Sequence, residues 1–210
     1  MHEIWVALKE GFPFSFINIA VFGFAIGVVL ERAYFQMTRY KVDTDEFMTQ
    51  VKKLVQNGSL DRAVKLCETE KLPLLEVVHA GLTRMSRGEE LAIAAMEEKM
   101  GEVVPALERR TPWLWTLANI ATLIGLLGTI SGLIRAFKAV GAISDPSLKT
   151  AYLSAGISEA MWNTFLGLFI AVVCMVCHLI LHTRGKGFKH DLERAVMQLE
   201  NLMTLRRVGG

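Results

Sequence analysis

The stretch TPWLWTLANIATLIGLLGTISGLI, residues 111–134, decides the fold. It carries no charged side chain and lies between the pair Arg109–Arg110 and Arg135. A helix that rises about 1.5 Å per residue needs roughly 20 apolar residues to cross a hydrocarbon core of about 30 Å. Lipid offers backbone N–H and C=O groups no other hydrogen-bond partners, so the stretch predicts a transmembrane helix.

Two further stretches are apolar enough to cross a membrane, residues 11–30 and residues 160–181. The composition agrees, because 52% of the side chains are apolar and only 21% are charged, outside the usual balance of a soluble domain. No strand pattern occurs. The sequence therefore predicts an all-α integral membrane protein whose three transmembrane helices extend into a cytoplasmic helical bundle.

The basic residues predict the orientation. Twelve Lys and Arg lie in residues 39–110 and six follow residue 182, and such residues favour the cytoplasmic side. We therefore expect residues 39–110 and the C-terminal tail in the cytoplasm and the N-terminus on the opposite side of the membrane. Four segments follow: residues 1–36, the N-terminus and first transmembrane helix; 37–110, a cytoplasmic helical segment; 111–183, the other two transmembrane helices and a short periplasmic link; and 184–210, a cytoplasmic amphipathic helix.

The cytoplasmic segment reads as a series of helices. Asp43 with Glu46 resembles a capping box, and Asn57–Gly58 predicts the end of that helix. Ser59 is expected to cap a second helix that runs to Glu70.

A third helix is expected from Pro73 to Arg87–Gly88, because proline suits the first turn. From Glu89, apolar residues at spacings of three and four predict one very long helix that enters the membrane, with a possible kink at Pro105. Apolar residues at the same spacing predict an amphipathic C-terminal helix: Phe188, Leu192, Val196, Leu199 and Met203.

The second and third transmembrane helices each have one face of small or weakly polar residues and an opposite face of bulky ones. Close helix packing explains such faces, since small residues let helices approach. Matching faces that also carry polar groups indicate in addition water, an ion or a polar partner. The small faces are Ala118, Ala121, Thr122, Gly125, Gly128, Thr129, Gly132 and Ala136 in the second helix, and Gly156, Glu159, Ala160, Asn163, Thr164, Gly167, Ala171 and Cys174 in the third.

Glu159 has two readings. An acidic side chain inside a membrane helix is costly and so indicates a function or a partner, here an entry or exit acceptor for an ion. If the helix starts near Tyr152, however, Glu159 lies only about 10 Å along it and is favoured by the helix dipole. Near the middle of the membrane the sequence offers only hydroxyl groups. A partner must therefore supply any carboxylate that takes up a proton there.

Other classes of function find little support. The string Cys174–Cys177–His178 has the spacing of covalent haem attachment, but it lies inside the third transmembrane helix. No nucleophile elbow, phosphate loop or zinc spacing occurs, and the basic residues are too spread for a nucleic-acid surface. We expect no catalytic residue, metal site, cofactor or nucleic acid.

Two motifs resemble those of the ExbB, TolQ and MotA proton-channel superfamily. Residues 121–137 are similar to its GLxGTxxGxxxxF signature, and residues 156–171 look like its GIxEALxxTxxGLxxA signature. The three-span layout is closest to the ExbB and TolQ branch. The chain departs from the family where Thr122 replaces a frequent proline and where Trp162 and Asn163 replace small or aliphatic residues.

The resemblance implies a proton-motive-force-driven motor subunit, or stator. Such subunits form a ring, here expected to be a homopentamer, around two copies of a single-span ExbD, TolR or MotB-like partner whose aspartate takes the proton. They couple ion flow to mechanical work in transport energisation, envelope maintenance or gliding motility. The expected ion-pathway residues are Thr129, Thr164, Glu159, Asn163 and Thr122, and the glycines expected to pack against partner helices are Gly125, Gly128, Gly132, Gly156 and Gly167.

Two competing hypotheses stay open at this point. A passive membrane scaffold would use the small faces only to hold partner helices, without ion flow. A redox carrier would use the cysteine pair of the third transmembrane helix.

Overall fold

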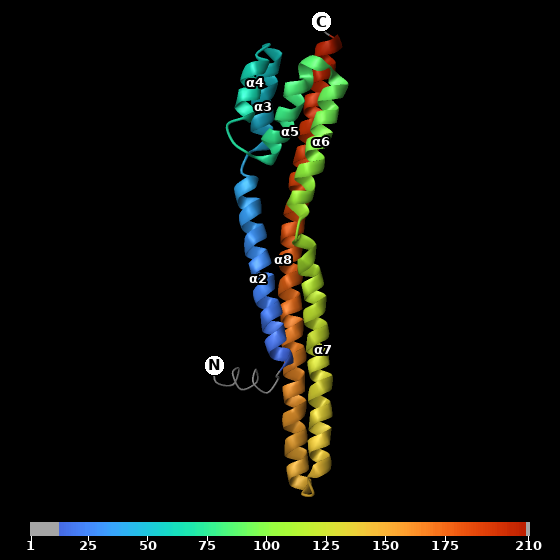
Figure 1. The fold of residues 1–210 in the computed structure, drawn as a ribbon. Helices are drawn as coiled ribbons and strands as arrows, with labels where there is room; N and C mark the ends of the chain where they lie inside the picture. Colours follow the sequence, from blue (N-terminus) through green and yellow to red (C-terminus); the bar gives the residue numbers. More distant parts are fainter. Residues whose placement is uncertain (1–12, 209–210) are drawn as a thin grey trace. The chain divides into compact units, whose positions relative to one another are not determined.

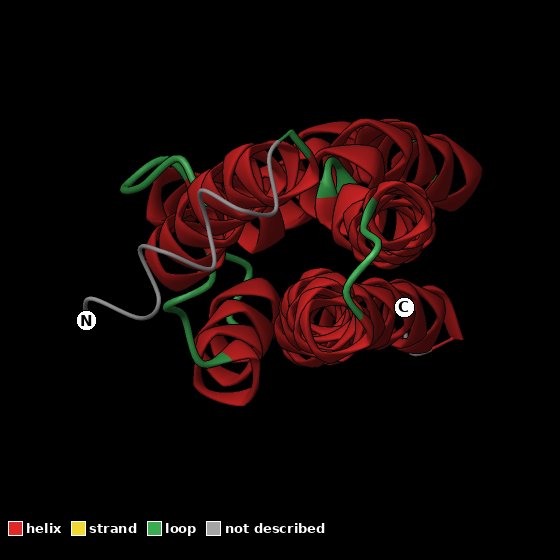
Figure 2. Cartoon of the chain, turned by 90° about the horizontal axis from the view of Figure 1, so that it is seen from below, coloured by secondary structure: helices red, strands yellow, loops and turns green. Residues whose placement is uncertain are grey.

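The computed structural model describes residues 13–208, with side chains to residue 204, and none of these residues forms a strand (Figure 2). Seven α-helices and one 3₁₀ turn account for nearly all of the described chain. They are α2 (Phe14–Arg39), α3 (Thr44–Gln56), α4 (Leu60–Cys67), α5 (Pro73–Arg84), η1 (Met85–Arg87), α6 (Glu89–Glu108), α7 (Thr111–Ala142) and α8 (Pro146–Val208) (Figure 1).

The three predicted transmembrane helices are confirmed. Three helical stretches among the described residues are long and apolar enough to cross a membrane, and they contain α2, α7 and α8. The beginning of the first predicted span, residues 11 and 12, lies outside the described residues. The protein is therefore an integral membrane protein with an all-α fold.

The chain divides into two compact units. Among the described residues, the membrane unit comprises residues 13–32 and 110–180, and the core unit comprises residues 33–109 and 181–208. The predicted segment limits at residues 36, 110 and 183 stay a prediction. The C-terminal segment is not a separate helix, because α8 continues without interruption from Pro146 to Val208.

The predicted long helix from Glu89 into the membrane is wrong. The chain instead leaves helical geometry at Arg109 and Arg110, where Arg110 has φ 65° in the left-handed region. Pro105, the expected kink, lies inside α6 without ending it. The physical reason is Pro112 in the first turn of α7, which has no N–H to donate to a preceding carbonyl and therefore starts a helix rather than continuing one.

The core unit is held together by apolar side chains from α3, α4, α5, α6 and the C-terminal part of α8. Met48, Val77, Met96 and Leu199 are each fully buried in this cluster. Four of the five predicted apolar positions of the C-terminal helix belong to this cluster or pack against it: Leu192, Val196, Leu199 and Met203. Phe188 stacks on Tyr40 at a ring-centroid distance of 4.1 Å.

The helix ends agree only in part with the prediction. The Asp43 carboxylate accepts hydrogen bonds from the backbone N–H groups of Asp45 and Glu46, at 3.0 and 3.3 Å, and so caps α3 as expected. Ser59 precedes α4, but its side chain makes no capping hydrogen bond, and α4 ends at Cys67 rather than at Glu70. Pro73 begins α5 as predicted.

Candidate functional site

The small face of α7 lies against the small face of α8 within the membrane unit. A Cβ atom on Gly167 would lie 2.6 Å from the Ala121 carbonyl oxygen and 3.0 Å from the Gly125 Cα. A Cβ atom on Gly132 would lie 3.0 Å from the Ala160 Cβ, and one on Gly156 2.4 Å from the Ala136 Cβ. The absence of side chains at these positions therefore sets how closely the two helices approach.

The five glycines expected to pack against partner helices all lie in this contact between α7 and α8 of one chain. Their packing against a partner stays a prediction. The opposite face of α7 is exposed, as the separation of small and bulky residues predicts: Leu123, Leu126, Leu127, Ile130, Ile134 and Phe137. An exposed apolar face of this kind suits lipid or other membrane helices.

Thr129 and Thr164 meet across the contact between α7 and α8, and their hydroxyl groups share a hydrogen bond. The Thr129 hydroxyl also donates to the Gly125 carbonyl oxygen of its own helix at 3.1 Å. Both threonines are half-buried. A hydroxyl group carries one donor and two acceptor positions, so the pair keeps acceptor capacity for water or a proton carrier.

Thr122 lies about two helical turns from Thr129 on the same helix. Its hydroxyl donates to the Ala118 carbonyl oxygen at 3.0 Å, and the residue is half-buried. Such a hydroxyl also retains acceptor capacity. The structure therefore places three of the five expected pathway residues as half-buried hydroxyls on α7 and α8.

Glu159 forms an ion pair with Arg135 across the two helices. The Arg135 Nη2 lies 2.8 Å from the Glu159 Oε1, and the Glu159 side chain is 21% exposed. Because α8 begins at Pro146 rather than near Tyr152, Glu159 lies about 20 Å along the helix. The explanation by the helix dipole is therefore wrong, since that effect fades beyond the first turn.

Asn163 faces a different neighbour from the threonines. It is 1% exposed, and its Oδ1 accepts a hydrogen bond from the Ser15 hydroxyl of α2 at 2.6 Å. The adjacent Thr164 instead contacts Thr129 of α7. The structure thus brings Asn163 together with α2, while its predicted role in an ion pathway remains untested.

Two polar residues of the first transmembrane helix were missed in the sequence. Ser15 and Asn18 are each 1% exposed and lie three residues apart on one face of α2. This spacing of polar side chains in an otherwise apolar helix is the signal that would have identified them.

The acidic side chains of the membrane helices are few and paired. In α2, in α7 and in α8 as far as Ile180, only Glu31 and Glu159 are acidic. Glu31 forms ion pairs with Arg32, at 2.8 Å, and with Arg110. Both carboxylates therefore have a cationic partner, and the level of the threonine pair has hydroxyl groups but no acid.

The cysteine and histidine residues of α8 are in an apolar setting. Cys174 is buried and Cys177 half-buried, and neither forms a disulfide. The His178 Nδ1 lies 3.0 Å from the Thr111 carbonyl oxygen, and its ring lies beside Trp115. In the described part of the chain, no group of three His, Cys, Asp or Glu residues is placed to hold a metal ion.

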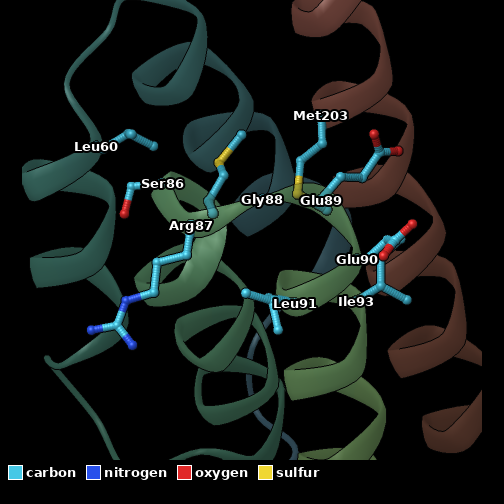
Figure 3. A pocket seen from close by; sticks show the side chains of 10 residues that line it. Leu60, Ser86, Arg87, Gly88, Glu89, Glu90, Leu91, Ile93 and Met203 are labelled. Atoms are coloured by element: carbon cyan, nitrogen blue, oxygen red, sulfur yellow. The ribbon is translucent and has the colours of Figure 1, made fainter.

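The core unit contains an open groove of about 910 Å³, formed by residues of α4, η1, α6 and α8 and the Gly88 turn. Figure 3 shows an apolar floor with charged side chains at its edge. Its lining gathers no set of convergent catalytic groups: Leu60, Met85, Ser86, Arg87, Gly88, Glu89, Glu90, Leu91, Ile93 and Met203.

Comparison with known proteins identifies relatives of similar sequence. The chain is 26% identical over 163 residues to the ExbB-like 3 protein of Synechocystis sp., covering 76% of this chain and 77% of that one. It is 29% identical over 115 residues to the Tol-Pal system protein TolQ of Haemophilus influenzae, covering 55% and 50%. The biopolymer transport protein ExbB of Pseudomonas putida is 25% identical over 159 residues, covering 71% and 48%. The chain thus spans about half the length of the latter two relatives.

A family model described as the MotA/TolQ/ExbB proton channel family matches residues 69–194, more than half of the chain. The match includes α7, the threonine pair and the Glu159 ion pair. The protein belongs to the MotA/TolQ/ExbB proton channel family.

Proposed function

We propose that this chain is the channel-wall subunit of a proton-driven motor. The observation that carries the proposal is the hydrogen-bonded pair Thr129–Thr164, half-buried between α7 and α8 at a level with no acidic side chain. The family match and the relatives named ExbB and TolQ support it. The role is conduction and movement rather than covalent catalysis.

The proton acceptor belongs to a partner. A proton that crosses a membrane needs a group that binds and releases it, and hydroxyl groups titrate far outside the physiological range. The partner is a single-span ExbD, TolR or MotB-like protein with an aspartate in its membrane helix. Copies of this chain, expected to be five, form a ring around the partner's helices; the family match supports this arrangement.

The threonine hydroxyls accept hydrogen bonds from water or from the protonated aspartic acid as the proton passes. Ion-paired Glu159 lies toward one end of α8 and serves at the entry or exit of the pathway. One charge that crosses 100 mV releases about 2.3 kcal/mol. That free energy is enough to shift the populations of two packed states of a ring and its partner.

We also propose the orientation. The core unit lies in the cytoplasm of a bacterial cell and the link between α7 and α8 in the periplasm, with the N-terminus on the periplasmic side of the inner membrane. The twelve basic residues in residues 39–110 and the six after residue 182 support this orientation.

The test is proton flux in vesicles that contain the chain and its single-span partner. The double substitution Thr129→Val and Thr164→Val removes both hydroxyls with little change in volume. We expect it to lower flux at least tenfold while the complex still purifies intact. The matched control is Thr116→Val, an exposed hydroxyl of α7, which should leave flux unchanged. Full flux in the double variant would contradict the proposal.

The passive scaffold is the second candidate. The close α7–α8 contact at Gly125 and Gly167 is what favours it, since such packing needs no ion. A scaffold would retain its effect on the envelope after the proton gradient has been collapsed with an ionophore. Loss of that effect under the same treatment would leave the motor as the function.

A further inference from the structure

The membrane unit holds a second polar cluster, on the α2 side of Asn163. Ser15, Asn18 and Asn163 are each 1% exposed. We refer to these three residues as the α2 polar site. Phe14 of the same helix end approaches α7, since a Cβ atom on Gly128 would lie 3.2 Å from the Phe14 Cβ and 2.9 Å from the Asn163 Cβ. The α2 polar site is therefore enclosed by three helices.

Two amide atoms of the α2 polar site lack a hydrogen-bond partner in the described part of the chain. The Ser15 hydroxyl donates to the Asn163 Oδ1 at 2.6 Å. The Asn163 Nδ2 and the Asn18 Oδ1 are buried and have no hydrogen-bond partner among the described residues. One is a donor and the other an acceptor. Buried polar atoms in proteins nearly always have partners, and the requirement is stricter in lipid than in a water-soluble core.

The residues that carry the two unpartnered atoms lie near one another along the helices. Asn18 is three residues beyond Ser15, so the two share one face of α2 and differ by about 4.5 Å along its axis. Since Ser15 contacts Asn163 directly, Asn18 lies about one turn from Asn163. That separation suits a small molecule that joins the two amides.

We propose that the α2 polar site binds one water molecule within the membrane, which accepts a hydrogen bond from the Asn163 Nδ2 and donates one to the Asn18 Oδ1. A buried water typically makes two to four such bonds. The site contains no carboxylate to balance the charge of a cation, so we assign a neutral water molecule to it. Rotating either amide by 180° changes which atoms are left over, but water still satisfies them because it both donates and accepts.

The bound water adds a second polar attachment of α2 to α8 beside the hydrogen bond between Ser15 and Asn163. The Thr129–Thr164 pair is a separate contact, between α7 and α8. The inference does not rest on the proposed function, since it requires neither proton flow nor a partner protein.

The first test is a double-mutant cycle on the full chain in detergent, using Asn18→Leu, Asn163→Leu and the double variant. Leucine has nearly the shape of asparagine and no polar atoms. Each single variant leaves the other amide without a partner and should lower the unfolding midpoint by roughly 3–8 °C. The unfolding midpoint of the double variant should fall by clearly less than the sum of the decreases in the two single variants. The control Asn119→Leu alters an exposed amide that bonds within its own helix and should show no coupling to Asn18→Leu.

The second test is a structure of the full chain at a resolution that shows ordered water, in sodium and in choline salts. We expect one peak within hydrogen-bond distance of both amides in either salt. Direct contact of the two amides, an empty site or a peak that disappears in choline would each overturn the proposal. Additive effects in the mutant cycle would overturn it as well.

Discussion

Glycine positions in the membrane unit fall into two groups that differ in what surrounds them. Gly125 and Gly167 lie where a side chain would meet backbone atoms of the facing helix. Gly23 and Gly27 of α2 have the same spacing as many packing motifs, but nothing lies within 4 Å of a Cβ atom at either position. The spacing alone does not distinguish the two groups.

Gly167→Ala should destabilise the protein by about 1–3 kcal/mol, because the added methyl group would lie 2.6 Å from the Ala121 carbonyl oxygen, a backbone atom that cannot rotate away. Thermal unfolding in detergent measures the effect. Gly23→Ala is the matched control. It should leave stability unchanged or raise it by up to about 1 kcal/mol, since alanine is the better helix former. Equal losses in the two variants would show that packing does not distinguish these positions.

At the scale of single elements, α3 and α4 each follow a residue of a type that favours the N-cap position, Asp43 and Ser59. Asp43 uses its carboxylate on two backbone N–H groups of α3. Ser59 stands at the corresponding position before α4, but its side chain forms no such bond. Both residues are good capping types, so only the local backbone decides which of them caps.

Asp43→Ala should therefore lower the free energy of unfolding by about 0.5–2 kcal/mol, the usual value of an N-cap hydrogen bond. Ser59→Ala should change it by less than about 0.5 kcal/mol, as expected for a surface residue without a capping bond. Chemical denaturation of the full chain, followed by circular dichroism, compares the two. A loss at Ser59 as large as that at Asp43 would contradict the assignment.

The beginning of α7 shows how a short local signal can outweigh a long pattern. The apolar spacing from Glu89 onward continues into the second transmembrane helix. The helix is nevertheless interrupted at Arg110. Pro112 ends the run of backbone hydrogen bonds because it has no N–H. The break was predictable from this proline, whereas Pro105 is tolerated within α6.

At the scale of the whole molecule, the two units have different physical bases. Small residues that bring α7 and α8 together hold the membrane unit, while the core unit has a buried apolar cluster of the kind found in soluble helical proteins. Cys67 belongs to that cluster and is 4% exposed. Burial raises the pKa of the Cys67 thiol from 9.0 to about 12.

The raised pKa predicts how the stability of the core unit depends on pH. Below pH 9 the thiol is protonated in both the folded and the unfolded chain. Between pH 9 and about 12 the unfolded chain loses the proton first, so this contribution to stability is lost as pH rises. Other titratable groups contribute equally to the pH dependence of the wild type and of Cys67→Ala, so their contributions cancel when the two proteins are compared. The stability advantage of the wild type should therefore shrink over this range, as urea midpoints at several pH values measure. A constant difference would contradict the prediction.

The sequence by itself determined the elements of this protein. Hydropathy is local, and a run of apolar residues long enough to cross a bilayer has one stable backbone conformation there, so the three membrane helices were predictable. The motifs around Thr129 and Thr164 likewise identified the family that the family model matches. Hydropathy and sequence motifs both depend only on residues that are close together in the sequence.

Only the tertiary structure decided which side chains meet. Asn163 and Thr164 are adjacent in sequence and were assigned to one face, yet the first contacts Ser15 and the second Thr129. The ion pair between Glu159 and Arg135 likewise joins two helices, and no pattern in the sequence indicated it. Contacts of this kind depend on the rotation and separation of packed helices. These are set by side chains on several elements at once, so no single stretch of sequence contains them.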